Sequence, residues 1–221
     1  MRILYHLWLQ PRCRVVRLAL AEKGLGFEAA LEKIWERRPE FLAMNPAGDV
    51  PVLVEDGQAI VGVDAICTYV EDLYPEPPLY GRTAIEGAEI RRLVAWFDEK
   101  FAREVTDNLV GEKVMKRFLG QGTPNSAAIR AGAANLRVHL DYVSWLAERR
   151  DWLAGSALSL ADVAAGAQIS CLDYIAAVPW DEYPKAKAWY ARLKSRPSFR
   201  TVLADLVPGL PPPKHYADLD F

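Results

Sequence analysis

The stretch Asp49-Val50-Pro51-Val52-Leu53 decides the fold, because it places a proline at the mouth of a short apolar run, residues 52–54. Proline has no N–H to donate to a sheet, so it is found at strand starts and edges. The residue before it is pushed toward extended geometry, and X-Pro bonds are the usual place for a cis peptide. We therefore predict an extended backbone at a strand entrance, suited to holding a peptide-like ligand.

The residues on either side of this stretch predict one small α/β unit over residues 1–79. Apolar spacing predicts elements in the order strand 3–7, helix 14–23, strand 27–31, a short helix from Pro39, strands 52–54 and 59–61, and helix 65–73. Asp56-Gly57 indicates a hairpin between the last two strands, and Asp64 can cap the helix that follows. A mixed sheet in the order βαβ-α-ββα results, closed by the linker Pro75-Glu76-Pro77-Pro78.

From residue 85 to residue 204 only helices are predicted. The apolar spacing favours helices over residues 86–101, 127–149, 184–196 and 198–204. Ser159-Leu160-Ala161-Asp162 has the spacing of a capping box, and the apolar helix it starts is expected to be the buried centre of this second domain. A Pro-rich tail, residues 205–221, completes the chain.

Composition excludes several classes of function. The chain has 221 residues, 51% of them hydrophobic, and a net charge of −2, so it shows no nucleic-acid footprint. No apolar run reaches the ~20 residues of a membrane helix, and the first residues lack a signal-peptide pattern. The three cysteines, Cys13, Cys67 and Cys171, are too widely spaced for a disulfide framework or a metal site. We expect a cytoplasmic protein without direct membrane insertion.

Three motifs in this order resemble the glutathione S-transferase superfamily. They are the run at residues 45–53, Ala65-Ile66-Cys67-Thr68-Tyr69, and the box at residues 159–162. The resemblance implies a thioredoxin-like N-terminal domain, an all-helical C-terminal domain and a cis Val50–Pro51 peptide. It also implies a two-fold homodimer that pairs the N-terminal domain of one chain with the C-terminal domain of the other.

Three longer sequence segments are similar to one branch of that superfamily. They are Trp35-Glu36-Arg37-Arg38-Pro39-Glu40-Phe41, residues 111–117, and the tail at residues 215–221. They resemble the FzlA family, transferase-like proteins that bind the tubulin-like division protein FtsZ in alphaproteobacteria. The resemblance implies a non-catalytic bacterial cell-division protein that crosslinks or curves FtsZ filaments at the division site.

The transferase site is degenerate at the positions that matter for glutathione. Gln10 stands where the Ser- and Cys-type members carry the residue that stabilises the thiolate, and Gly62-Val63 replaces the acidic residue and serine that hold the γ-glutamyl carboxylate. Each lost hydrogen bond to a charged group costs roughly 1.5–3 kcal/mol. Only Val50, with Pro51, remains as a vestigial ligand contact, so no cofactor is expected and glutathione is not expected to bind.

Cys13 leaves two interpretations open. It lies near a helix N-terminus between Arg12 and Arg14, where dipole and charge both lower a thiol pKa. The partner position of a Cys-x-x-Cys motif is however Gln10, which favours a buried structural thiol.

The FtsZ-binding surface is predicted at two places. The first is Trp35 with Arg37 and Arg38, because Trp and Arg are enriched at interface hot spots; the alternative is that Trp35 tucks against the sheet. The second is the tail, with Asp218, Leu219, Asp220 and Phe221 after a proline-stiffened segment. The alternative there is that its aromatic side chains fold back on the chain's own helices.

Two other functions remain open at this point. One is a glutathione S-transferase with an atypical site that uses Gln10 or Cys13. The other is a binder of some different small molecule in the leftover cleft.

Overall fold

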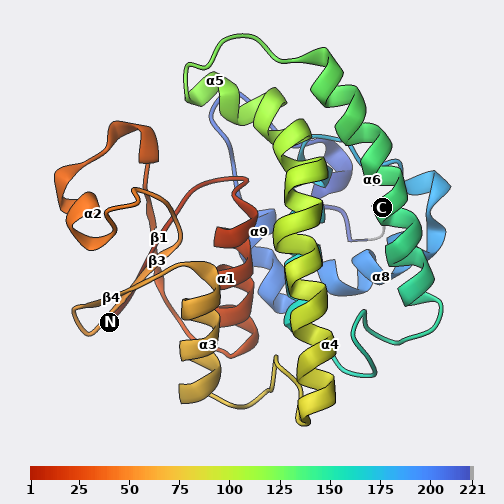
Figure 1. Ribbon diagram of the computed structural model, residues 1–221, viewed down its shortest axis with the longest axis horizontal. Coiled ribbons are helices and arrows are strands. Elements are labelled where there is room, and N and C mark those ends of the chain that lie inside the picture. The colour runs from red at the N-terminus through yellow and green to blue at the C-terminus, as the bar shows by residue number, and fades with distance from the viewer. Residues whose placement is uncertain (220–221) are drawn as a thin grey trace.

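The computed structural model describes residues 1–219 and has a sheet-based N-terminal domain packed against a helical C-terminal domain (Figure 1). Four strands form one mixed sheet in the order β2-β1-β3-β4. The strands are β1 (Arg2–His6), β2 (Glu28–Leu31), β3 (Val52–Glu55) and β4 (Gln58–Val61). β1 pairs with β2 in parallel and with β3 antiparallel, and β3 pairs antiparallel with β4. The predicted thioredoxin-like sheet is confirmed.

Helices cover both faces of this sheet. α1 (Pro11–Glu22) and α3 (Val63–Leu73) lie between the sheet and the helical domain, and α2 (Pro39–Met44) lies on the other side (Figure 1). α1 begins three residues before the predicted start, because Pro11 occupies the first helical position, where its fixed φ is already helical. A short 3₁₀ turn, η1 (Ile34–Glu36), connects β2 to α2.

The proline stretch behaves as predicted. The Val50–Pro51 peptide is cis, and Val52 begins β3 directly after it. At the hairpin, Asp56 and Gly57 both take positive φ, 50° and 80°, as a type I′ turn requires. The predicted cap at Asp64 is wrong: α3 begins one residue before it, and Gly62, with φ 91°, occupies the N-cap position.

One long helix opens the C-terminal domain. It consists of α4 (Ala84–Ala95), η2 (Trp96–Met115), which has π-type winding, and α5 (Lys116–Phe118). It therefore continues well past the predicted end at residue 101. The reason is that Val105, Leu109 and Val114 extend its buried face by three further turns. Residues 119–125, which include Gly120 and Gly122, connect it to α6 (Ser126–Ala147).

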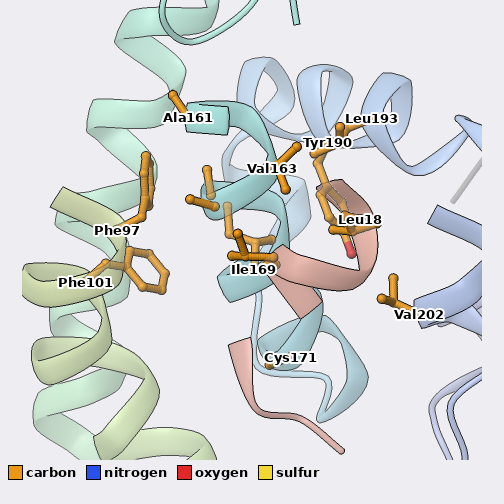
Figure 2. Close-up of a cluster of buried hydrophobic side chains, with 14 of the residues drawn as sticks. Leu18, Phe97, Phe101, Ala161, Val163, Ile169, Cys171, Tyr190, Leu193 and Val202 are labelled. Atoms are coloured by element: carbon orange, nitrogen blue, oxygen red, sulfur yellow. The ribbon is translucent and has the colours of Figure 1, made fainter. Parts of the chain in front are cut away.

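The centre of the helical domain is α7 (Leu160–Tyr174), every residue of which is buried. Figure 2 shows Leu18 of α1 on one side of it and Phe97 and Phe101 of the long helix on the other. Asp162 fixes its start: the carboxylate accepts hydrogen bonds from the Ser159 N–H at 3.1 Å and from the Trp189 indole at 3.0 Å. The predicted buried central helix is thus confirmed, and it contacts both domains.

The remaining elements close the bundle against α7. They are η3 (Trp180–Glu182), α8 (Pro184–Lys194), η4 (Pro197–Phe199), α9 (Arg200–Leu203) and η5 (Lys214–Tyr216). Within residues 1–219, no helix is both long and apolar enough to span a bilayer.

Candidate functional site

A groove lies beside the cis proline, where β3, α1 and the start of α3 meet. It has a volume of about 460 Å³, and its lining includes Val50, Pro51, Gly62 and Val63. The charged groups along it are Arg12, Asp49 and Asp64. One cation and two carboxylates give this groove a net negative charge, which disfavours an anionic ligand.

The one backbone donor expected to serve a ligand is already in use. The Val50 N–H donates to Asp49 Oδ1 at 2.8 Å. Asn45 fixes the same turn, because its side-chain amide donates to the Asp49 carbonyl at 2.7 Å. A ligand carbonyl at Val50 would have to displace a carboxylate acceptor from the same N–H.

Position 63 offers no side-chain hydrogen bond to a ligand, since valine has no hydroxyl. Val63 is the first residue of α3, and the N-cap before it is a glycine with no side chain. Gly62 and Val63 therefore lie where the sequence placed them, in the groove, and they bring no polar anchor to it.

Gln10 lines a second, neighbouring cleft between the two domains. This cleft measures about 310 Å³ and also involves Ile34 of η1 and Met115 and Lys116 of the long helix. Gln10 is the N-cap residue of α1, and its side chain accepts no capping hydrogen bond there. Gln10 therefore lines this interdomain cleft, whereas Val50, Gly62 and Val63 line the groove beside the cis proline.

Cys13 is completely buried. Burial raises the pKa of its thiol to about 12, and the neighbouring arginines do not offset that cost. The thiol is therefore protonated at neutral pH and shielded from solvent. Its position fits the structural interpretation and leaves no route to a reactive thiolate.

Trp35 is half-buried and bridges the domains. Its ring stacks on Phe118 at the end of the long helix, with centroids 5.8 Å apart and an interplanar angle of 18°. Phe118 also contacts Trp8, at 5.7 Å between centroids. Trp35 also packs on a buried cluster of its own domain that includes Phe41 and Val52 of β3, as the second interpretation expected. Its contact with Phe118 of the other domain was not predicted.

The two arginines after Trp35 differ in their surroundings. Arg38 binds the buried carboxylate of Glu32 through Nε at 3.2 Å and Nη2 at 2.5 Å, and this pairing raises the pKa of Arg38. Arg37 is exposed and takes a left-handed conformation with φ 46°. Arg37 is therefore the more accessible of the two cations.

The tail residues differ in how far they are exposed to solvent. Tyr216 is completely buried: its hydroxyl donates to the Val202 carbonyl at 2.9 Å. Asp218 is exposed, and Leu219 is 43% exposed. Asp220 and Phe221 lie outside the described residues. The tail therefore folds back through one aromatic side chain while the next residues face solvent.

Three residues that contact the predicted surfaces were not predicted from sequence. Phe118 stacks on Trp35. Tyr174 contacts the ring of Tyr216, and Asp173 lies 3.1 Å from His215 Nε2. Phe118 is 83 positions from Trp35 in the chain, and no local pattern links them. Asp173 and Tyr174 end the most apolar helix, and two adjacent polar groups there are a signal that could have been read as an anchor. No group of three His, Cys, Asp or Glu in the described part of the chain is arranged to hold a metal ion.

Comparison with known families assigns both halves of the chain. Residues 4–78 match the glutathione S-transferase N-terminal domain, and residues 124–197 match the glutathione S-transferase C-terminal domain. FtsZ-localized protein A of Caulobacter vibrioides is 50% identical over 224 residues, covering 100% of this chain and 98% of that protein. Glutathione S-transferase 3 of Zea mays is 29% identical, covering 97% and 98%.

Solved structures superpose over the whole chain. A glutathione S-transferase from Rhodospirillum rubrum F11 shares 56% identity, has a TM-score of 0.98 and covers 100% of both chains. FzlA from C. crescentus shares 49% identity, has a TM-score of 0.95 and covers 100% of this chain and 99% of that one.

Proposed function

This chain belongs to the glutathione S-transferase family, and from that premise we propose that it is a non-catalytic member that binds FtsZ filaments in cell division. The observation that carries the proposal is the 50% identity to FtsZ-localized protein A along the whole chain. In this proposal the protein is bacterial and cytoplasmic, and it organises filaments at the division site by crosslinking or curving them.

The filament-binding surface is proposed to comprise Trp35, Arg37 and Arg38 together with Asp218–Phe221 of the tail. The end of the long helix contacts Trp35 and the first part of the tail. Phe118 stacks on Trp35, and the guanidinium of its neighbour Arg117 lies against Gly209 of the tail. A Cβ at Gly209 would be only 3.2 Å from Arg117 Nη2.

The proposed absence of catalysis rests on how poorly the groove suits glutathione. Asp49 already accepts the Val50 N–H, and Val63 brings no hydroxyl for a carboxylate. Glutathione carries two carboxylates and one ammonium group, so its net charge repels a groove lined by Asp49, Asp64 and a single arginine. Cys13, the nearest thiol on α1, is buried and protonated.

Two copies of the surface are needed to join or bend filaments, so the protein is proposed to act as a two-fold homodimer. Each protomer then binds one FtsZ subunit, and the second contact gains from the high local concentration that the first creates. Light scattering at micromolar concentration is expected to give twice the chain mass; a monomer mass would contradict the dimer.

A second function is favoured by one observation. The groove beside the cis Val50–Pro51 peptide retains about 460 Å³, enough for a small peptide-like ligand. The alternative is therefore a glutathione S-transferase with an atypical site. Retention on glutathione resin together with electrophile turnover would support it, whereas pelleting with polymerised FtsZ and no retention supports the binding protein.

A further inference from the structure

The tail crosses the end of α7 and is fastened there by Tyr174. The Tyr174 hydroxyl accepts from the Val207 N–H at 2.9 Å and donates to the Leu210 carbonyl at 2.8 Å. Its ring contacts Tyr216 edge-on, with centroids 5.0 Å apart. One side chain of α7 thus binds the beginning, the middle and the far part of the tail.

The residue before it, Asp173, has a carboxylate with no exposed surface. Oδ1 accepts from the Trp180 indole at 2.8 Å, and His215 Nε2 of the tail lies 3.1 Å from the same oxygen. Because a carboxylate oxygen accepts, His215 Nε2 carries the proton in this bond. The tail therefore supplies a hydrogen bond to a buried acid.

Lys194 of α8 joins the same cluster. Its ammonium group is also fully buried, lies 3.8 Å from Asp173 Oδ2 and donates to the His215 carbonyl at 2.8 Å. The tail thus adds one hydrogen bond to each buried group, to Asp173 through a side chain and to Lys194 through its backbone.

A buried carboxylate is costly unless hydrogen bonds compensate its desolvation. Burial raises the pKa of Asp173, which records that cost. If the tail left, Asp173 would lose the His215 hydrogen bond and Lys194 would lose a carbonyl partner. The helical domain therefore holds two buried polar groups whose hydrogen bonds depend on this segment.

We propose that Asp173 and His215 form a latch that holds the tail on α7 and thereby fixes Asp218 and Leu219 at the protein surface. Asp173 and His215 are positioning residues, because they act through the two residues that follow Ala217. The latch is supported by the contacts described above. Its role in presenting the tail to FtsZ rests on the proposed function.

The test uses the exposed Lys214, which offers trypsin a cleavage site directly before His215. Cleavage there releases residues 215–221, and mass spectrometry of the whole chain detects the trimmed species. The rate of such cleavage follows the population of the opened tail when opening and closing are fast. The variants are His215→Leu, which removes the donor, and His215→Gln, which restores an N–H at the Nε2 distance.

We expect His215→Leu to be trimmed roughly tenfold faster than the wild type or more, as the loss of one hydrogen bond to a charged group implies. His215→Gln should be trimmed at close to the wild-type rate. Equal rates for Leu and wild type, or equally fast trimming of Leu and Gln, would overturn the latch. Unfolding of the whole Leu variant without a trimmed species would also overturn it, because the latch predicts that the tail opens alone.

Co-sedimentation with FtsZ tests separately whether the latched tail serves filament binding. The Leu variant should lose filament binding and the Gln variant should retain it. If trimming follows the prediction while the wild type itself does not pellet with filaments, the latch stands and the proposed function fails.

Discussion

Trp35 of the N-terminal domain stacks on Phe118 of the C-terminal domain, with their rings 5.8 Å apart and inclined by 18°. The residue predicted to meet FtsZ is therefore also part of the interface between the two domains. A filament that binds at Trp35 contacts a side chain whose orientation depends on how the domains are packed.

Replacing this ring should affect stability and binding to different extents. We predict that Trp35→Ala lowers the free energy of unfolding by at least the ~0.5–1.5 kcal/mol of one aromatic pair, while co-sedimentation with FtsZ filaments falls severely. Trp35→Phe keeps the stack and should recover most of the stability. Urea unfolding measures the first quantity and pelleting measures the second.

The matched control is Trp145→Ala. Trp145 is 47% exposed and stacks on Tyr142 of the same helix, α6, so its loss has a similar local cost. It should leave filament binding unchanged. If Trp145→Ala and Trp35→Ala weaken binding equally, the assignment of the surface to Trp35 is wrong.

Reversing the charge of the tail should weaken binding without unfolding the protein. Asp218 is exposed, but its carboxylate favours the charged form of the buried Lys194. We therefore predict that Asp218→Lys lowers the unfolding midpoint by a few degrees, because it sets a second cation near Lys194, and weakens filament binding roughly tenfold or more. Asp141→Lys makes the same change at an exposed position of α6 and serves as the control. Normal pelleting of Asp218→Lys would remove the tail from the proposed surface.

The groove should not support glutathione chemistry. We predict no retention on glutathione resin and no turnover of a standard electrophile above background, with Gln10→Ala and Cys13→Ala indistinguishable from the wild type. The reasons are the occupied Val50 N–H and the thiol pKa of Cys13 near 12. Turnover that disappears with either substitution would show that the site is catalytic.

The raised pKa of Asp98 should make the free energy of unfolding depend on pH. It is 8% exposed, Oδ1 has no hydrogen-bond partner among the described residues, and burial raises its pKa from 3.8 to about 6, partly opposed by Arg12. Between these values the folded state holds a proton that the unfolded state has lost, so stability falls as pH rises from about 4 to 6 and stays reduced above that.

Asp98→Asn removes this penalty. We expect its free energy of unfolding to exceed that of the wild type by up to about 3 kcal/mol at pH 7. The difference should be much smaller at pH 4 and should vanish at lower pH, as the unfolded state of the wild type also becomes protonated. Urea unfolding at both values measures this. A stabilisation that is equal at pH 4 and pH 7 would assign the effect to packing instead.

The elements that follow local rules were predictable from sequence, and the long-range ones were not. Val50-Pro51, the Asp56-Gly57 turn and the Ser159–Asp162 start of α7 each carry their signal within a few residues. The packing of Trp35 depends on Phe118, which is 83 residues away in the chain. The packing of the tail depends on Asp173 and Tyr174. Hydrophobic periodicity is a local signal, so it could not predict either contact.

The start of α3 shows the same limit at short range. Asp64 has the side chain of an N-cap, but the residue that takes the positive φ at the entry to the helix is Gly62. The groove contacts before α3 thus depend on backbone conformation, which the side-chain preferences alone do not reveal.

The most direct test of the central claim is co-sedimentation of the wild-type protein with FtsZ polymerised in GTP, measured with and without saturating glutathione. We predict that the protein pellets with filaments, that the bound fraction saturates, and that glutathione does not change it. Protein that stays in the supernatant with polymerised FtsZ, or that glutathione releases from the pellet, would contradict a non-catalytic FtsZ-binding role.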